Sequence, residues 1–342
     1  MAVSLPIQTD FSLRSLNTFG VDACARAYLS VSCVSALEEV RNVAALTAMP
    51  RLILGGGSNI LLTQDFPGLV LHMQSKGVQI VAEDDDATYV RAAAGESWHE
   101  FVQWTLDHDL GGLENLSLIP GSVGAAPIQN IGAYGVEIKD RFHSLTMFDF
   151  ETGQTRVLNK TECAFGYRDS IFKHELRDRA VVLNVTFALP KNWQPNIRYA
   201  DVAQELAAGS ISEPTARQIS DAVIAIRTRK LPNPAVVGNA GSFFKNPVVT
   251  IEKRDALLQR YPQLVNHAQP DGSVKLAAGW LIDQCGWKGK TAGAAGVYEN
   301  QALVLVNRGG ASGQDIAKLA AAIQSDVAQR FDVLLEPEPV FL

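Results

Sequence analysis

Pro50–Asn59 reads P-R-L-I-L-G-G-G-S-N, an apolar run that leads directly into three glycines. The apolar residues predict a short buried strand, and successive glycines after a strand expose backbone N–H groups that can bind an anion. No G-x-G-x-x-G pattern opens a helix here, because Ile60–Leu62 again predicts a strand, and no Gly-Lys-Ser/Thr follows. The stretch therefore argues against a Rossmann fold and a P-loop. It fits a phosphate cradle and a glycine turn between two strands equally well.

A second glycine-rich segment, Ile119–Gly135, reads I-P-G-S-V-G-A-A-P-I-Q-N-I-G-A-Y-G. It follows a helix predicted over Ser97–Leu110, where Ser97 and Glu100 form a capping-box pattern. Free backbone amides can bind a diphosphate without a lysine. Two such segments predict one dinucleotide held between two lobes, and the glycines alone allow FAD, NAD or a nucleotide sugar.

Three further stretches combine charged, hydroxyl and aromatic side chains. They are G-Y-R-D-S-I-F-K at Gly166–Lys173, G-N-A-G-S-F-F-K-N-P at Gly238–Pro247 and L-E-P-E at Leu335–Glu338. Arg168 is expected either to pair with Asp169 at a turn or to bind a planar carboxylate through two hydrogen bonds. Ser242 is the neutral proton carrier of its stretch, where Lys245 can hold an anion beside it. The plainer interpretation of that stretch is a tight loop that enters a buried strand.

The composition is that of a folded protein with free thiols. The chain has 342 residues, of which 47% are hydrophobic and 19% charged, and this length predicts two or three domains. A net charge of −6 argues against nucleic-acid and anionic-membrane binding. The four cysteines form no C-x-x-C pair, so we expect no metal site and no disulfide framework. Without a signal peptide or a long apolar run, the sequence predicts a cytoplasmic protein, which we expect to be a monomer.

Hydrophobic periodicity predicts helices and strands along the whole chain. Further helices are expected at 35–49, 213–228, 274–285 and 312–330, and strands at 78–82, 88–94, 142–150, 180–189 and 302–306. Residues 1–22 are expected to form an irregular arm, and Trp193–Tyr199 a loop.

Together with N-T-F-G at Asn17–Gly20, these motifs in this order resemble the UDP-N-acetylenolpyruvoylglucosamine reductase family of flavoenzymes. The resemblance covers nearly the whole chain. It implies an α+β protein, with a two-subdomain FAD-binding fold of the vanillyl-alcohol-oxidase type and a smaller C-terminal α+β substrate domain. We expect the FAD-binding subdomains at residues 1–76 and 77–230, the second with the Arg168 insertion and the Tyr199 loop. The substrate domain is expected at 231–330, and residues 331–342 can pack back onto the FAD lobes.

The resemblance also implies the site residues. The catalytic residues would be Arg168, Ser242 and Glu338, whereas Glu336 should point elsewhere. The residues expected to bind FAD are Leu54, Gly55, Gly56, Gly57, Ser58, Asn59, Pro120, Gly121, Ser122, Gly124, Ala125, Ile128, Gln129 and Gly132. Those expected to bind the substrate are Tyr199, Lys230, Asn246 and Gln301. Covalent relatives usually attach flavin through a histidine or cysteine near the first glycine loop, and this loop contains neither, so we expect non-covalent FAD.

The implied reaction is the NADPH-dependent reduction of UDP-N-acetylglucosamine enolpyruvate to UDP-N-acetylmuramate for bacterial cell-wall peptidoglycan. Hydride from reduced flavin would leave negative charge on the substrate carboxylate, which Arg168 and a protonated Glu338 can stabilise. Ser242 would then protonate the other alkene carbon. Two alternatives remain. A flavin oxidase of the same superfamily would reoxidise in air, and a non-catalytic nucleotide-sugar-binding module would be colourless.

Overall fold

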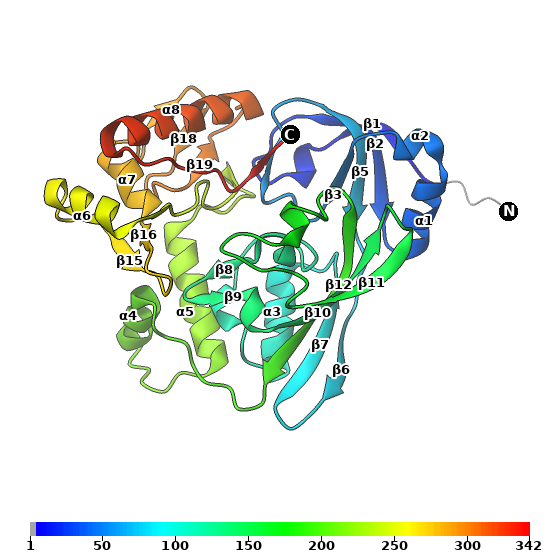
Figure 1. Ribbon diagram of the computed structural model, residues 1–342, viewed down its shortest axis with the longest axis horizontal. Coiled ribbons are helices and arrows are strands. Elements are labelled where there is room, and N and C mark those ends of the chain that lie inside the picture. The colour runs from blue at the N-terminus through cyan, green and yellow to red at the C-terminus, as the bar shows by residue number, and fades with distance from the viewer. Residues whose placement is uncertain (1–4) are drawn as a thin grey trace. The chain divides into compact units, whose positions relative to one another are not determined.

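The computed structural model describes residues 5–342, which form an α+β protein with two compact units. Unit 1 contains the segment that ends at Phe11 together with Cys24–Gly57 and Phe66–Arg229. Unit 2 contains Ser12–Ala23, Ser58–Asp65 and Lys230–Leu342. Each unit is therefore built from segments that lie far apart in the sequence, as the ribbon colours in Figure 1 show.

Unit 1 contains a four-stranded sheet in the order β1-β2-β5-β3. Its strands are β1 (Gln8–Ser12), β2 (Cys24–Val31), β5 (Phe66–Met73) and β3 (Arg51–Leu54). β5 is parallel to both β2 and β3. It is buried along most of its length, as the central strand of a parallel sheet should be. The expected irregular arm is therefore wrong at residues 8–12, which form a strand; residues 1–4 lie outside the described part of the chain.

Two short helices, α1 (Val34–Asn42) and α2 (Ala44–Thr47), pack on the core of this sheet. Leu37, Val40 and Leu46 are buried there, as the periodicity indicates. The single helix predicted over 35–49 is interrupted at Val43, whose backbone is extended (φ −100°, ψ 103°).

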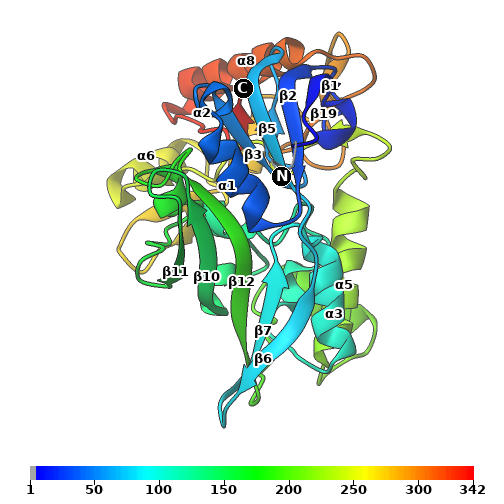
Figure 2. The ribbon, with the colours of Figure 1, turned by 90° about the vertical axis from the view of Figure 1, so that its right-hand side faces the viewer.

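A five-stranded antiparallel sheet in the order β11-β10-β12-β7-β6 forms the second layer of unit 1, and Figure 2 shows its strands side by side. The strands are β6 (Val78–Glu83), β7 (Ala87–Ala93), β10 (Phe142–Asp149), β11 (Gln154–Asn159) and β12 (Ala180–Pro190). Helix α3 (Trp98–Asp107) packs on this sheet through Trp98 and Phe101, whose rings lie 5.7 and 5.2 Å from that of Phe187. The predicted cap is confirmed, because Ser97 accepts a hydrogen bond from the Glu100 N–H.

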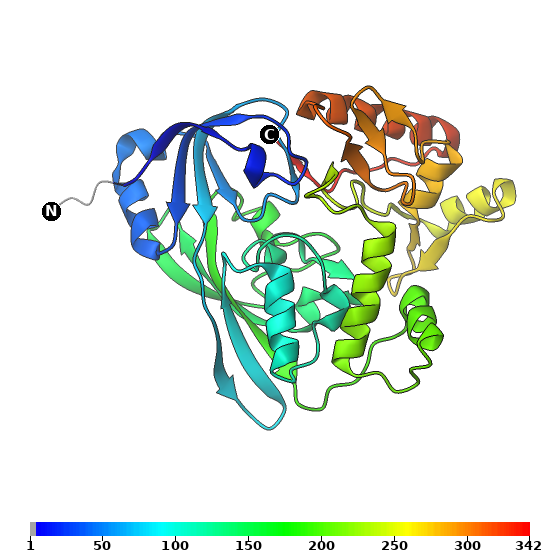
Figure 3. The same ribbon diagram turned by 180° about the vertical axis from the view of Figure 1, so that it is seen from behind.

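Helices α4 (Ala200–Ala208) and α5 (Ala216–Lys230) share an apolar cluster. The inward residues Ile219, Val223 and Ile226 are those that the periodicity predicts, although α5 begins three residues later than expected. The Gln103 amide of α3 donates to the Ser220 hydroxyl at 3.1 Å, so α5 lies against α3 (Figure 3). Shorter elements of unit 1 are η2 (Glu114–Leu116), η3 (Ala126–Gln129), β8 (Gly132–Ala133), β9 (Val136–Glu137), η4 (Ile138–Asp140) and η5 (Ile171–Lys173).

Unit 2 combines three small sheets with three helices. The sheets are β13 (Gly238–Asn239), β19 (Leu305–Asn307), β18 (Ala295–Val297) and β17 (Thr291–Ala292); β14 (Val248–Val249), β16 (Val274–Leu276) and β15 (Asn266–Ala268); and β20 (Val340–Phe341) with β4 (Ile60–Leu61). The helices are α6 (Ile251–Arg260), α7 (Ala278–Gln284) and α8 (Gly313–Phe331). The helix predicted from Val274 is wrong in its first turn, because Val274–Leu276 pairs with β14 and β15 as a strand. The Ser312/Asp315 capping box at the start of α8 is confirmed. No helix among the described residues is long and apolar enough to cross a membrane.

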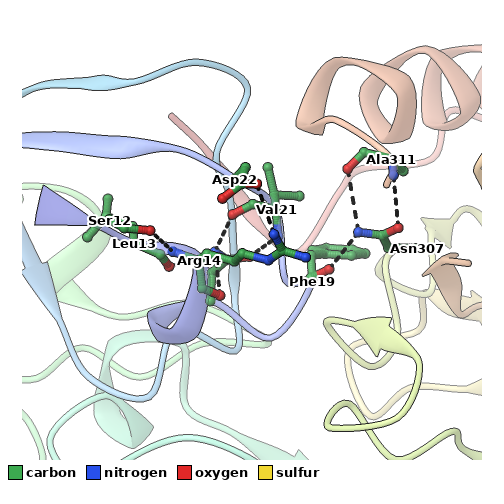
Figure 4. A network of polar contacts seen from close by, with 9 residues as sticks. Ser12, Leu13, Arg14, Phe19, Val21, Asp22, Asn307 and Ala311 are labelled. Carbon is green, nitrogen blue, oxygen red and sulfur yellow. Dashed lines mark hydrogen bonds and ion pairs between the residues drawn. The ribbon is translucent and has the colours of Figure 1, made fainter. Parts of the chain in front are cut away.

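The N-T-F-G turn, which follows η1 (Arg14–Leu16), joins the N-terminal segment of unit 2 to its C-terminal sheet. Asn17 closes the turn, because its amide donates to the Leu13 and Val21 carbonyls at 2.8 and 3.0 Å. The Phe19 carbonyl then accepts a hydrogen bond of 2.9 Å from the Asn307 amide (Figure 4). A β-carbon on Gly238 would lie 2.2 Å from the same carbonyl, so only glycine fits there. The turn therefore fixes the start of the Gly238–Pro247 stretch.

Candidate functional site

The two glycine-rich segments pack directly against each other in unit 1. A β-carbon on Gly55 would lie 2.2 Å from the Ser122 hydroxyl, and one on Gly56 would lie 2.9 Å from the Gly121 α-carbon. The second segment is held in place by backbone hydrogen bonds from Trp98 N–H to the Gly121 carbonyl (3.0 Å) and from Val123 N–H to Glu96 (2.9 Å). The absence of side chains at Gly55 and Gly56 thus lets the two loops approach each other closely.

This cradle fits a phosphate-bearing cofactor. The Ser122 hydroxyl is buried and has no hydrogen-bond partner among the described residues. A buried hydroxyl without a partner costs free energy, which a ligand oxygen would recover. Ala125 lies 3.4 Å from the same position on Gly55, and Gly57 has the positive φ (60°) of a tight turn. Several residues predicted to bind FAD are thus brought together, whereas Ser58 and Asn59 belong to unit 2.

A buried histidine lies beside the first glycine loop. His72 on β5 hydrogen-bonds the backbone of Gly55, and burial lowers the pKa of its ring. Its Nδ1 lies 2.9 Å from the Tyr28 hydroxyl and its Nε2 lies 2.7 Å from the Gln74 amide nitrogen. Phe11 stacks on Tyr28 with 3.8 Å between ring centres. Sequence reasoning missed His72, because a lone histidine in an apolar strand carries no pattern.

Arg168 lies in a loop that is attached to the second glycine-rich segment. Its Nη2 donates to the Gly132 carbonyl at 2.8 Å, and the Ser170 hydroxyl donates to Ile128 at 2.6 Å. The Arg168 backbone has φ +54°, a conformation that costs free energy for a residue with a β-carbon. The neighbouring Asp169 carboxylate lies 2.8 Å from His174 Nε2. Arg168 and two predicted FAD-binding residues are thus neighbours within unit 1.

Tyr199 immediately precedes α4 and packs edge-on against Tyr134, with 5.2 Å between ring centres. Tyr134 also hydrogen-bonds Arg227, whose Nε donates to the Leu118 carbonyl at 3.2 Å. Burial lowers the pKa of the Arg227 guanidinium and raises that of Tyr134. Arg227 lies in the last turn of α5, within the helix predicted over 213–228. The structure separates it from Arg229, which pairs with Glu205 on the surface at 2.6 Å.

The two motifs of unit 2 run antiparallel to each other. The Glu338 N–H donates to the Phe243 carbonyl at 2.8 Å, and Phe244 bridges to Pro337. Ser242 is exposed, while Phe243 and Phe244 are fully buried and anchor the stretch. Ser242 and Glu338, which are 96 positions apart in the printed sequence, therefore occupy neighbouring positions at this pairing.

Asn59 supports the backbone of the same segment, because its amide donates to the Glu338 carbonyl at 3.2 Å. Its own carbonyl accepts a hydrogen bond of 2.9 Å from Val340. A residue predicted to bind the cofactor thus also contacts the backbone of a residue predicted to be catalytic.

The polar side chains next to these two motifs bind each other or the backbone. The exposed Glu336 carboxylate pairs with Lys245. Lys245, which was expected to hold an anion beside Ser242, instead binds Glu336. The Asn246 side-chain oxygen accepts the Ala278 N–H at 2.9 Å and thereby supports the start of α7.

Two further residues predicted to bind the substrate, Gln301 and Lys230, lie in unit 2. The Gln301 side chain accepts a hydrogen bond from Leu303 N–H at 3.3 Å, and Lys230 is the last residue of α5. Arg168 and Tyr199 belong to unit 1, whereas Ser242, Glu338 and these substrate residues belong to unit 2. The predicted catalytic set is therefore drawn from both units. No group of three or more His, Cys, Asp or Glu side chains that could hold a metal occurs in residues 5–342.

In the comparison with known proteins, two family models match the chain, one toward its N-terminus and one at its C-terminus. A family model described as "FAD binding domain" matches residues 25–159, and one described as "UDP-N-acetylenolpyruvoylglucosamine reductase, C-terminal domain" matches residues 233–342. A UDP-N-acetylenolpyruvoylglucosamine reductase of Paraburkholderia phymatum is 57% identical over 341 residues, or 99% of both chains. The chain belongs to the UDP-N-acetylenolpyruvoylglucosamine reductase family.

Other members of the reductase family agree with this assignment. The reductase of Paraburkholderia xenovorans is 57% identical over 334 residues, which cover 97% of this chain and 96% of the relative. The crystal structure of the Thermus caldophilus reductase has the same fold, with a TM-score of 0.67 over 98% of each chain at 24% identity. The predicted α+β fold and the predicted cofactor FAD are confirmed, and the chain is an FAD-dependent oxidoreductase. The predicted domain boundaries and site residues stay predictions.

Proposed function

We propose that this protein uses NADPH and non-covalent FAD to reduce UDP-N-acetylglucosamine enolpyruvate to UDP-N-acetylmuramate in peptidoglycan synthesis. The observation that supports the proposal is the antiparallel backbone pairing in unit 2, which brings the stretch that contains Ser242 next to the segment that contains Glu338. The names of the relatives support the substrate, since 57% identity extends over the whole chain. We further propose that the protein is a cytoplasmic monomer whose partners are small molecules rather than nucleic acid or membrane.

FAD, when bound, would supply the hydride. The cradle of Gly55, Gly56, Gly121 and Ser122 would hold its diphosphate through backbone N–H groups and the buried hydroxyl. Both ring nitrogens of His72 are already in contact with neighbouring side chains. This histidine is therefore a poor nucleophile toward a flavin, which supports non-covalent binding.

Arg168 would bind the substrate carboxylate. A guanidinium presents two parallel N–H groups that match the two oxygens of a carboxylate. As negative charge develops on that carboxylate, a preorganised donor of this kind contributes roughly 3–4 kcal/mol to the lowering of the barrier. Tyr199, Lys230, Asn246 and Gln301 would hold the nucleotide-sugar part, and this supplies the binding energy that orients the alkene.

Glu338 and Ser242 would complete the chemistry. Glu338 in its protonated form donates a hydrogen bond to the same carboxylate, while its backbone is held by Phe243 and Asn59. The exposed Ser242 hydroxyl would give its proton to the alkene carbon that does not receive the hydride. A positioned general acid contributes about 10²–10⁴-fold to the rate.

The test is a comparison of two half-reactions in Ser242→Ala, followed at the flavin absorbance band. Reduction by NADPH should keep its rate, whereas reoxidation by the enolpyruvyl substrate should slow by at least 100-fold. Ser325→Ala, at an exposed position of α8 in the same unit, is the matched control and should leave both rates unchanged. Equal slowing of both half-reactions in Ser242→Ala would show that Ser242 is not the proton donor.

A further inference from the structure

Unit 1 contains a cavity of about 390 Å³ that shares no residue with the predicted cofactor, substrate and catalytic sets. It lies where β9 ends, β10 begins and β11 ends, next to the loop before Tyr199; Figure 1 labels these strands. The cavity is lined by Gly112, Glu114, Val136, Asp140, Arg141, Lys160, Gln194 and Asn196. Its volume is within the range of about 300–1,000 Å³ that is usual for small-molecule sites.

The buried carboxylate of this cavity is already hydrogen-bonded. Glu114 is 2% exposed, and its two oxygens accept hydrogen bonds from Gly112 N–H (2.5 Å) and Trp193 Nε1 (2.9 Å). The exposed Asp140 carboxylate accepts the Glu137 N–H at 2.9 Å. The acidic side chains of the lining are thus each hydrogen-bonded to a nearby backbone N–H, and Glu114 is also hydrogen-bonded to the Trp193 ring.

The two cationic side chains that line the cavity are Arg141 and Lys160. Arg141 Nε is buried and has no hydrogen-bond partner among residues 5–342. The Arg141 side chain lies over Gly112, where an added β-carbon would be 2.8 Å from Nε, and its Nη1 makes a 3.3 Å hydrogen bond to the Asp140 carbonyl. Lys160 lines the cavity, is exposed and immediately follows β11. A buried charged donor without an acceptor is unfavourable unless a ligand supplies one.

We propose that this cavity binds a small oxyanion of the phosphate or carboxylate class, held by Arg141 from within and Lys160 from the rim. Guanidinium groups bind both kinds of anion through two N–H groups, and an ammonium group adds a mobile charge. The Gln194 and Asn196 amides lie at the same wall and can donate to the non-ionised part of a larger anion.

The site is connected to the loop that carries Tyr199. Trp193 is hydrogen-bonded to Glu114 of the cavity wall, and Asn196 donates to the Gly135 carbonyl at 3.1 Å. The Asn115 amide donates in turn to the Asn196 carbonyl at 2.9 Å. A bound anion would therefore stabilise the observed path of residues 193–198. Any effect on substrate affinity rests on the proposed role of Tyr199 and would be reciprocal between the two ligands.

The test is a titration of the flavin-loaded protein with inorganic phosphate at constant ionic strength, followed by tryptophan fluorescence and by calorimetry. We expect a saturable change in fluorescence that is absent in Trp193→Phe. Arg141→Met and Lys160→Met should each weaken phosphate binding by at least tenfold. Arg156→Met, which removes an exposed cation from β11, the strand that ends just before Lys160, should leave binding unchanged.

Because Lys160 is exposed, its variant keeps the test valid even if Arg141→Met destabilises the fold. Phosphate affinity that is unchanged in both variants, or a signal that potassium chloride reproduces, would overturn the proposal. Malonate in a parallel titration separates carboxylate from phosphate preference. Hydrogen exchange of residues 193–198 should slow when phosphate binds, and unchanged exchange would overturn the coupling to the loop. None of these readouts depends on turnover, so the proposed reaction is tested separately.

Discussion

Replacement of Gly56 by alanine tests the contact between the two glycine loops. The new β-carbon would lie 2.9 Å from the Gly121 α-carbon and 3.2 Å from its carbonyl carbon. Unbonded carbons normally approach to about 3.5–4.0 Å, so the loops would have to separate by roughly 0.6–1 Å. The obstacle is backbone rather than a flexible side chain, and rotation of a side chain therefore gives no relief.

A separation of this size would weaken the cradle. If it costs one hydrogen bond between a backbone N–H and a charged phosphate oxygen, the loss is about 2 kcal/mol. We therefore expect the FAD dissociation constant to rise about 30-fold in Gly56→Ala. The global fold should remain, because the substitution lies in a loop outside the cores of both sheets of unit 1.

The assay is a titration of flavin-free protein with FAD, followed by the quenching of flavin fluorescence, with circular dichroism as the check on folding. Gly209→Ala is the matched control, since its β-carbon would meet nothing closer than 3.5 Å. That variant should bind FAD like the parent protein. A folded Gly56→Ala protein with parental FAD affinity would refute the assignment of these loops to the cofactor.

Four further substitutions test the rest of the account. Asn307→Ala removes hydrogen bonds to the Phe19 carbonyl and the Ala311 N–H, and urea unfolding should show a loss of about 2–4 kcal/mol. Arg179 lowers the pKa of the buried Asp149 from 3.8 to about 2. The ion pair therefore contributes about 2 kcal/mol above pH 4, which is lost as the pH falls toward 2; Asp149→Asn should remove this part of the acid unfolding profile. Glu336→Gln breaks only an exposed pair and should keep kcat within about twofold, whereas Glu338→Ala should lower kcat by about 100-fold or more. Equal kcat values for the last two variants would contradict the assignment of Glu338.

Local signals predicted the elements whose ends and faces are set by neighbouring residues. Ser97 with Glu100 and Ser312 with Asp315 mark the starts of α3 and α8, because a cap acts over three residues. Where the predicted secondary structure was wrong, pairing with other strands determined the observed conformation. Val274–Leu276 has a helical pattern but becomes a strand between two others. The two- and three-residue strands of unit 2 are too short to carry a periodicity.

The same distinction between local patterns and tertiary contacts applies to the candidate site. Motif residues such as Arg168 and Ser242 could be named from short patterns and from the family resemblance. The contact of Gly56 with Gly121 and the hydrogen bond from Asn307 to Phe19, 288 residues away, depend on the folded chain alone. His72 was missed for a similar reason, since it is a single polar residue whose importance comes from burial.

The central claim is tested most directly by an anaerobic mixing experiment on the purified yellow protein. The flavin is first bleached with NADPH and then mixed with UDP-N-acetylglucosamine enolpyruvate in the absence of oxygen. The account predicts that the flavin absorbance returns and that UDP-N-acetylmuramate forms in equal amount. A protein that bleaches but regains its colour only when oxygen is admitted would be an oxidase, and that result would contradict the account.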